Sequence, residues 1–339
     1  MMRTLRAVCC LALVAGCARA HDPAPDAATE DAPTCTTRPV DVLIVMQATG
    51  YAAGVAIAAG FGLEELFELL RSDPRVDVHV GVVLTDMGAG EFACSPMGSD
   101  GVLRAAFPEM ATACEAMPVF SQLGPTTDLE TLTRTTACLV HGGDDRCWPQ
   151  TFEALLKAVT PSSSTIAFRG VAGGHADGSN QGFLREDALL AVVILNAYDD
   201  CSVTDLWYFS PEAPRCPPSR VCCEDRLLPL ERYVQGLRAL GRDVVVSAIT
   251  GIPRDERPPA GDAEALRALA ARPEMQRWEP MCFDALIEQA WPSPRTVRLA
   301  AEFPGVVRSV CDHGGREGGL GPALREIGEH VATRACYGR

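Results

Sequence analysis

Polar side chains follow a short apolar run near the start of the chain. Residues 40–46 are rich in β-branched and aliphatic side chains and are bounded by Gly50, so they predict a fully buried parallel strand. Gln47 and Thr49 come next, on the loop that leaves the strand. In open α/β sheets that loop is where ligands bind. These side chains are therefore the first candidates for binding chemistry.

Three glycine-rich segments carry the histidines that could do chemistry. Segments 141–145 and 173–178 place histidine near aspartate, and segment 313–315 begins with histidine. His175 and Asp177 are the candidates for an exported enzyme or for a metal site. Exposed polar residues are the usual content of such loops, however, and the second segment lacks the alternating acids and distal glutamate of a calcium loop.

Known catalytic motifs are missing from the sequence. It contains no Gly-x-Ser-x-Gly elbow, no His-Glu-x-x-His helix and no phosphate-binding Gly-Lys-Ser/Thr loop. A triad can still be assembled from residues remote in sequence, so an enzyme remains an alternative. We expect no catalytic residue, no cofactor and no bound metal.

Apolar runs alternate with amphipathic segments along the chain. This alternation predicts a doubly wound α/β fold with a mostly parallel central sheet flanked by helices, in one domain over residues 38–339. Residues 103–150 have no clear periodicity, and we expect irregular structure pinned by cysteines. Further strands are predicted at 76–85, 188–195, 243–250 and 305–311, and helices at 54–70, 151–159, 227–240, 262–272, 294–303 and 319–333. Thr151 and Asp262 are the predicted caps of two of these helices.

The first sixteen residues are typical of a signal peptide. Arg3 and Arg6 precede an apolar stretch that is too short to span a bilayer. Residues 13–17 resemble a bacterial lipobox, which implies cleavage before Cys17 and lipidation of its thiol; ordinary secretion with cleavage after Ala20 is the alternative. Acyl chains would tether the protein to a membrane of the cell envelope, on the periplasmic side or at the surface. Residues 17–37 are rich in Ala, Pro and Asp and predict a flexible linker.

Charge and cysteine content agree with export. The formal net charge of −14 repels nucleic acid, and we exclude a nucleic-acid partner. Twelve of the fifteen cysteines lie beyond Cys17, and an even number outside a reducing cytosol predicts disulfides. The pairs 94–114 and 138–147 are hypotheses for locally closed loops, and zinc at 216–223 is a less favoured alternative because no histidine lies nearby. The disulfide candidates are Cys94, Cys114, Cys138, Cys147, Cys201, Cys216, Cys282 and Cys311.

Several pieces of the sequence resemble von Willebrand factor A (vWA) domains, and in particular vWA-like lipoproteins of myxobacteria. The matching pieces are the opening strand and loop and the segments 78–83, 183–193, 199–202 and 307–311 with the final helix. Together they cover about residues 38 to 335. The resemblance implies a Rossmann-like sheet whose carboxyl edge binds ligands.

Such domains typically hold Mg²⁺ in a metal-ion-dependent adhesion site, with Asp-x-Ser-x-Ser after the first strand. In this chain Gln47, Thr49 and Tyr51 stand at those three positions, and Ala197 stands where a later loop usually supplies aspartate. Only Thr49 keeps suitable chemistry for a hard cation, which needs carboxylates to balance its charge. The resemblance therefore implies a degenerate, metal-free site, unless Asp199 or Asp200 is recruited as in a metal-dependent adhesin; a surface loop more often just solvates such charges.

Large aromatic residues are few. Trp207, Tyr208 and Phe209 lie in a cysteine-rich insertion, where they either anchor a partner or pack the insertion onto the domain. Taken together, these features lead us to expect a membrane-tethered exported lipoprotein whose non-catalytic domain binds an unknown protein or has a structural role in the envelope.

Overall fold

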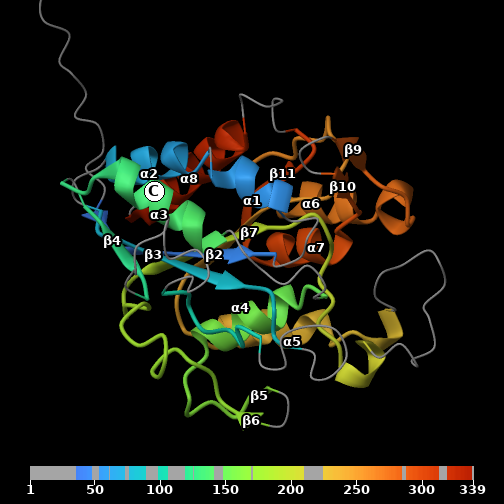
Figure 1. Cartoon of the computed structure of the whole chain (residues 1–339), viewed down its shortest axis with the longest axis horizontal. Coiled ribbons are helices and arrows are strands. Elements are labelled where there is room, and N and C mark those ends of the chain that lie inside the picture. Colours follow the sequence, from blue (N-terminus) through green and yellow to red (C-terminus); the bar gives the residue numbers. More distant parts are fainter. Residues whose placement is uncertain are drawn as a thin grey trace, which may run out of the picture. The chain divides into compact units, whose positions relative to one another are not determined.

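The structure is a computed structural model of the whole chain (Figure 1). The chain divides into residues 1–35 and 36–339. The structure describes residues 36–47, 53–60, 62–72, 76–88, 98–105, 119–124, 126–140, 148–168, 171–209, 224–284, 288–312 and 319–337. The expectations for residues 1–16 and for Cys17 lie outside these ranges. Within them, no helix is long and apolar enough to cross a membrane.

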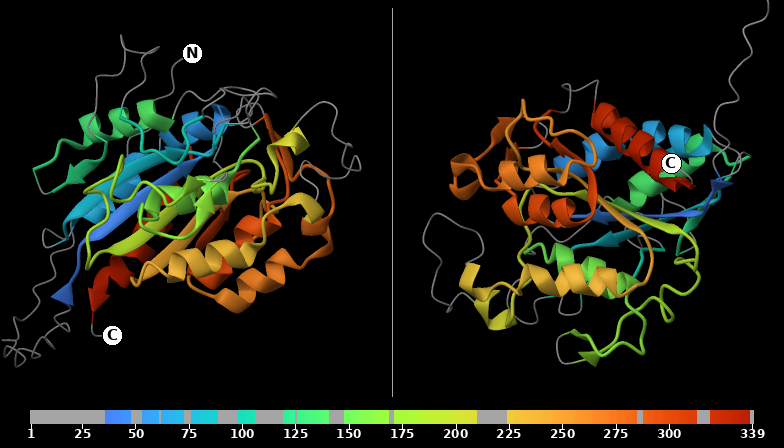
Figure 2. Two further views of the ribbon diagram at one scale, coloured as in Figure 1. Left: turned by 90° about the horizontal axis from the view of Figure 1, so that it is seen from below. Right: turned by 180° about the vertical axis from the view of Figure 1, so that it is seen from behind.

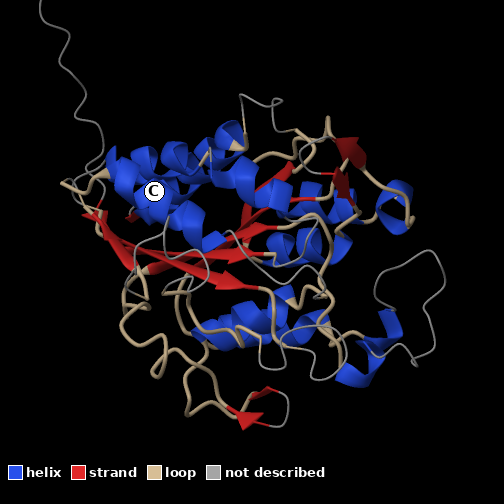
Figure 3. Ribbon diagram, viewed as in Figure 1, coloured by secondary structure: helices blue, strands red, loops and turns tan. Residues whose placement is uncertain are grey.

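A six-stranded, mostly parallel sheet forms the centre of the fold. Its strand order is β11-β8-β7-β2-β3-β4, and only the edge strand β4 runs antiparallel to its neighbour (Figures 1 and 3). The strands are β2 (Val40–Met46), β3 (Val78–Leu84), β4 (Ser121–Leu123), β7 (Leu189–Leu195), β8 (Val244–Thr250) and β11 (Pro304–Ser309). This arrangement confirms the prediction of a doubly wound, vWA- or Rossmann-like α/β fold.

Burial on both faces explains why the central strands are almost continuously apolar. Every residue of β2, β3, β7 and β8 is buried. In β2, Ile44 and its alternate neighbours pack into one apolar cluster, whereas Leu43 and Val45 pack into another on the opposite face. A parallel strand covered by helices on both sides has no solvent face on which polar residues would be stable.

Helices cover the two faces of the sheet. Residues of α1, α2, α3 and α8 share an apolar cluster with one face, and residues of α4, α5, α6 and α7 share a cluster with the other (Figures 1 and 2). The helices are α1 (Ala53–Gly60), α2 (Leu63–Ser72), α3 (Leu129–Val140), α4 (Thr151–Val159), α5 (Leu230–Arg238), α6 (Ala263–Ala270), α7 (Pro294–Glu302) and α8 (Gly321–Ala335).

The segment expected to be one helix, 54–70, forms two. A turn at Gly62 separates α1 from α2. A Cβ atom at Gly62 would lie 2.5 Å from the backbone nitrogen of Gly321, which is closer than non-bonded atoms approach. The glycine therefore lets the start of α2 pack directly against the start of α8, and the prediction of a continuous helix was wrong.

Regular structure also occurs where none was expected. Within 103–150 the structure contains β4 and the twelve-residue helix α3. A two-stranded hairpin, β9 (Cys282–Asp284) with β10 (Glu288–Ala290), lies between α6 and α7 in the sequence. The first and last described strands, β1 (Thr36–Thr37) and β12 (Cys336–Tyr337), pair with each other. The remaining short strands are β5 (Ala167–Phe168) and β6 (Val171–Ala172).

Candidate ligand-binding edge of the sheet

The carboxyl ends of β2 and β7 define the position where a ligand is expected in this fold. β2 lies between β3 and β7, so the chain winds to one side of the sheet after β2 and to the other after β7. Loops that diverge in this way open a crevice at the switch point of a doubly wound sheet. Gln47 follows β2 directly, and Ala197 follows β7 after one residue. The structure thus places these two predicted site residues beside each other.

The Gln47 side chain fastens the two loops together. Its Oε1 accepts hydrogen bonds from the backbone N–H of Ala197 at 2.7 Å and of Tyr198 at 3.0 Å. Its own backbone N–H donates to the carbonyl of Leu195 at 3.1 Å. Gln47 is only 2% exposed and Ala197 is fully buried. The side-chain carbonyl oxygen of Gln47, at the position where a metal ligand was considered, is therefore engaged with the backbone.

Thr49 and Tyr51, the other two predicted positions after β2, lie outside the described residues. The described part of this edge therefore consists of Gln47, Ala197 and the loop that follows Ala197.

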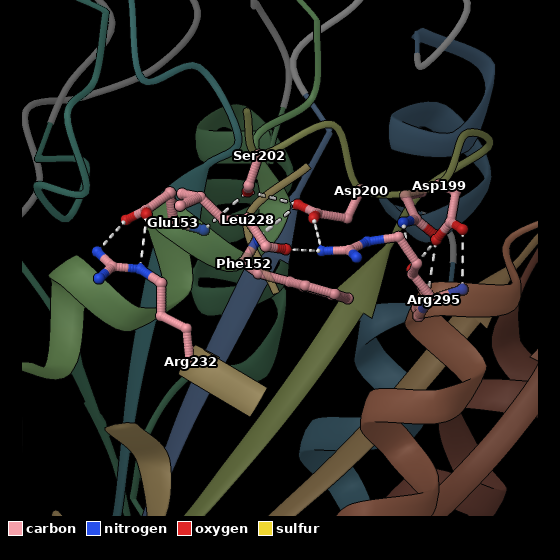
Figure 4. Close-up of polar contacts among 10 residues, drawn as sticks. Phe152, Glu153, Asp199, Asp200, Ser202, Leu228, Arg232 and Arg295 are labelled. Atoms are coloured by element: carbon pink, nitrogen blue, oxygen red, sulfur yellow. Dashed lines mark hydrogen bonds and ion pairs between the residues drawn. The ribbon is translucent and has the colours of Figure 1, made fainter. Parts of the chain in front are cut away.

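The side chains of Asp200 and Ser202, in the loop after β7, cap the start of helix α4. The backbone N–H of Phe152 donates to Asp200 Oδ1 at 2.9 Å, and that of Glu153 donates to Ser202 Oγ at 3.1 Å (Figure 4). Ser202 Oγ also donates to Asp200 Oδ1 at 2.6 Å. These bonds satisfy N–H groups that have no partner within a helix. The predicted cap, Thr151, makes no such bond, and that prediction was wrong.

Asp199 caps helix α7 in the same way. Its Oδ2 accepts from the N–H of Arg295 at 2.8 Å, and its Oδ1 accepts from the N–H and the hydroxyl of Thr296, both at 3.0 Å. Burial raises the pKa of Asp199 to about 6, although hydrogen bonds and charge from Arg295 oppose that shift. Two consecutive aspartates therefore cap two different helices of one layer.

The Arg295 guanidinium balances the charge of these carboxylates. One of its terminal nitrogens lies 3.1 Å from Asp200 Oδ2 and also donates to the carbonyl of Leu228 at 2.9 Å (Figure 4). Burial lowers the pKa of Arg295, but attraction to Asp200 and Asp199 outweighs it and raises that pKa above its ordinary value. The ring of Phe152 lies 5.5 Å from the guanidinium carbon. The guanidinium of Arg295 thus lies beside the carboxylates of Asp199 and Asp200, which a metal ion would need as ligands.

The interpretation of Asp199 and Asp200 as solvated surface charges was therefore wrong. Asp200 is 1% exposed, and each carboxylate accepts hydrogen bonds with both of its oxygens. A divalent ion would have to displace helix N–H groups or Arg295 to use them. Among the described residues, no three His, Cys, Asp or Glu side chains are grouped as metal ligands.

Among the histidine-containing loops, the structure describes segment 173–178, and there His175 and Asp177 do not contact each other. His175 Nε2 lies 3.0 Å from the carbonyl of Asp100, whereas Asp177 accepts from the N–H and hydroxyl of Ser162 at 2.6 and 3.0 Å. The two candidates thus contact different partners. The histidines of 141–145 and 313–315 lie outside the described residues.

A stack of aromatic rings that was not predicted from the sequence lies next to this edge. The rings of Trp278 and Trp291 stack at 3.8 Å with an interplanar angle of 12°, and Tyr198 lies 6.4 Å from Trp291 at 27°. The backbone N–H of Trp291 donates to the carbonyl of Ala197 at 2.8 Å. Gln47, through Ala197 and Tyr198, therefore also positions the stack. Tyr198, Trp278 and Trp291 come from segments that lie side by side only in the folded chain. Their spacing in the sequence therefore does not indicate that the rings stack.

The aromatic residues of the insertion pack in part onto the domain. Tyr208 contacts a small cluster with Val203 and Leu227, and the guanidinium of Arg226 lies 4.7 Å from its ring. Trp207 is 42% exposed. The side chain of Phe209 is outside the described set.

Cysteines of the described part are disulfide-bonded. Cys282 and Cys311, two of the disulfide candidates, are bonded to each other and join β9 to the residues after β11. Cys138, Cys201 and Cys336 are also disulfide-bonded. The remaining candidates, Cys94, Cys114, Cys147 and Cys216, lie outside the described residues, so the proposed pairs 94–114 and 138–147 stay predictions.

Comparison with known proteins found similar solved structures but no family. No protein-family profile matches the sequence, and no curated protein sequence matches it. Solved structures similar to this chain include two of proximal thread matrix protein 1 from the mussel byssus. One covers 88% of this chain at 11% identity with a TM-score of 0.35, and the other covers 64% at 13% identity with a TM-score of 0.28. This chain spans 48% and 39% of the lengths of those two structures.

Proposed function

We propose that this protein is an exported lipoprotein, tethered to a membrane of the cell envelope through Cys17, whose vWA-like domain binds another protein without catalysis and without bound metal. The observation that carries the proposal is the arrangement at the carboxyl edge of the sheet. There the side-chain oxygens of Gln47, Asp199 and Asp200 are committed to backbone N–H groups and to Arg295.

Charge balance supports binding without metal. A hard divalent cation needs several oxygen ligands with carboxylates among them. The carboxylate of Asp200 is already paired with the guanidinium of Arg295, and adding a second cation beside that guanidinium would cost electrostatic energy. Aromatic rings lie next to this edge instead: Tyr198 is in the loop after β7, and Trp291, whose backbone N–H donates to Ala197, stacks beside it. Aromatic residues are enriched at protein interfaces.

The separation of the polar loop residues supports a non-catalytic role. General acid–base catalysis needs groups within hydrogen-bond reach of one reacting atom. His175 contacts Asp100 while Asp177 contacts Ser162, so the pair favoured by the sequence for an enzyme does not converge.

The proposed membrane tether is supported by the lipobox-like sequence of residues 13–17.

Affinity capture from an envelope extract tests this proposal. The tagged lipoprotein, held in mild detergent, is incubated with the extract in two parallel arms, one with 5 mM EDTA and one with 5 mM MgCl₂, which are chosen to remove or saturate a typical cation site. We expect the same protein to be retained in both arms and to be absent from a column that carries an unrelated acidic protein. Retention only with Mg²⁺ contradicts metal-free binding, and the absence of any specific protein in both arms contradicts the binding function.

A further inference from the structure

We propose that the outer edge of β9 binds an extended, basic segment of a partner protein, with Phe283 as the side chain that anchors it. This inference rests on the proposed binding function and names the surface and the class of partner. It starts from the hairpin formed by β9 and β10, which forms a separate two-stranded sheet.

The backbone of β9 supports an extended partner. In the part of the chain that the structure describes, β9 pairs with β10 and with no other strand. A strand paired on one side presents a row of N–H and C=O groups on the other. The groups that match such a row are those of another extended strand, and strand addition of this kind is a recurring mode of peptide recognition.

Phe283 supplies the anchor. It is 73% exposed, and Trp207, at 42%, is the other exposed large hydrophobic residue of the described part. Phe283 faces Gln289 across the hairpin, so no apolar cross-strand neighbour covers it there. A partner that buries this ring would gain hydrophobic free energy by removing its apolar surface from water. Among the described residues, a strand edge that no second strand pairs with and an exposed aromatic ring thus coincide at Phe283.

The base of the hairpin is held rigidly, which lowers the entropy cost of binding. The disulfide between Cys282 and Cys311 ties β9 to the end of β11. The N–H of Met281 donates to the carbonyl of Ala290 at 2.8 Å. Trp291 follows β10 directly and stacks on Trp278, which precedes β9.

The negative net charge of this protein favours a basic partner segment over a second copy of the chain. A second copy of this chain would also present an open β9 edge, but each copy carries a formal net charge of −14. Like charges of that size oppose association of two copies, whereas a segment rich in Lys or Arg is attracted. Alternation of side chains along a strand would place apolar residues toward Phe283 and basic residues toward the acidic protein.

A displayed library of random linear peptides tests the inference on the full lipoprotein in detergent. We expect selection to enrich peptides that alternate apolar and basic residues. For a synthetic copy of the best peptide, Phe283→Ala should weaken binding at least tenfold, and the matched control Trp207→Ala should leave it unchanged. Added NaCl should weaken binding as charges are screened. Both substitutions are at exposed side chains, and a circular dichroism spectrum like that of the natural chain verifies folding.

Each other outcome overturns the inference. Equal effects of the two substitutions, or enrichment of acidic peptides or of none, contradict a basic strand on β9. A dimer in light scattering that Phe283→Ala dissociates means that the occupant is a second copy. If the envelope partner is captured equally well by Phe283→Ala, the binding function stands and the assigned surface is wrong. If no envelope protein is captured by the natural chain, the proposed function itself fails.

Discussion

The side-chain oxygen of Gln47 lies 2.7 Å from the backbone nitrogen of Ala197, which joins the loop after β2 to the loop after β7. In a doubly wound sheet these loops normally diverge to admit a ligand. Here a neutral amide bridges them, and the residues that it holds are Ala197 and Tyr198 rather than metal ligands.

Replacing Gln47 with Ala should destabilise the fold. The N–H groups of Ala197 and Tyr198 lose their shared acceptor, and each buried unsatisfied donor costs about 1–3 kcal/mol. We expect the free energy of unfolding, measured by urea titration, to fall by roughly 2–6 kcal/mol, the sum of the two costs. Gln181→Ala, at an exposed position, is the control and should change stability by less than about 0.5 kcal/mol. Equal free energies of unfolding for the two variants would show that the hydrogen bonds of the Gln47 side chain do not stabilise the fold.

Replacing Asp200 with Ala should have a larger effect. The change removes the cap of α4 and leaves the guanidinium of Arg295 without its carboxylate. Breaking a buried ion pair by removing one partner costs about 3–5 kcal/mol. Thermal and urea unfolding measure the loss, and the exposed Asp187→Ala serves as the matched control. A loss below about 1 kcal/mol would mean that Asp200 is solvated after all.

Asp199 should make stability depend on pH in the direction opposite to that of an ordinary paired carboxylate. Its pKa of about 6 in the folded chain lies above the unfolded value of 3.8, so the folded state binds the extra proton between these values. The contribution of Asp199 to stability is therefore full below about pH 4 and is lost as the pH rises through 6, by roughly 3 kcal/mol in total.

The variant Asp199→Asn isolates this contribution, because the Asn side chain still offers one oxygen to the N–H groups at the start of α7. Burial also raises the pKa of Asp41, and that background is common to both proteins. We expect the stability difference between the natural chain and the variant to shift in favour of the variant from pH 4 to pH 7. A difference that stays constant across this range in urea titrations would refute the raised pKa.

Cys17→Ser should release the protein from membranes, because a serine hydroxyl cannot receive the acyl chains that the lipobox implies. Fractionation of cells followed by immunodetection measures the change, and Cys9→Ser, within the expected signal peptide, is the control. Unchanged recovery in the membrane fraction would contradict lipid tethering.

The strands and most helices could be predicted from the sequence because their signals are local. β7 and β8 are continuous apolar runs. Asp262 caps α6 by accepting from the N–H of Ala265, three residues ahead. Helix α3 was not predicted although it has comparable local features: Asp128 precedes it and accepts a hydrogen bond from the N–H of Glu130, and Leu132 and Leu139 lie on its buried face.

The candidate site could be predicted only in part, because its contacts join residues far apart in the chain. The sequence predicted a site residue at Gln47, but the hydrogen bond from Gln47 to Ala197 spans 150 residues. The cap of α4 comes from Asp200, 48 residues after Phe152, so a nearby threonine was the local candidate and was wrong. Whether an aspartate is solvated or buried depends on the helices that pack over it, which spacing in the sequence does not reveal.

The central claim is that the carboxyl edge of this sheet holds no metal, and calorimetric titration of the protein with Mg²⁺, Mn²⁺ and Ca²⁺ tests it most directly. We expect no saturable heat for any of the three ions, because Arg295 and the helix N–H groups already occupy Asp199 and Asp200. Binding with a micromolar dissociation constant that Asp199→Asn or Asp200→Asn abolishes would contradict the claim.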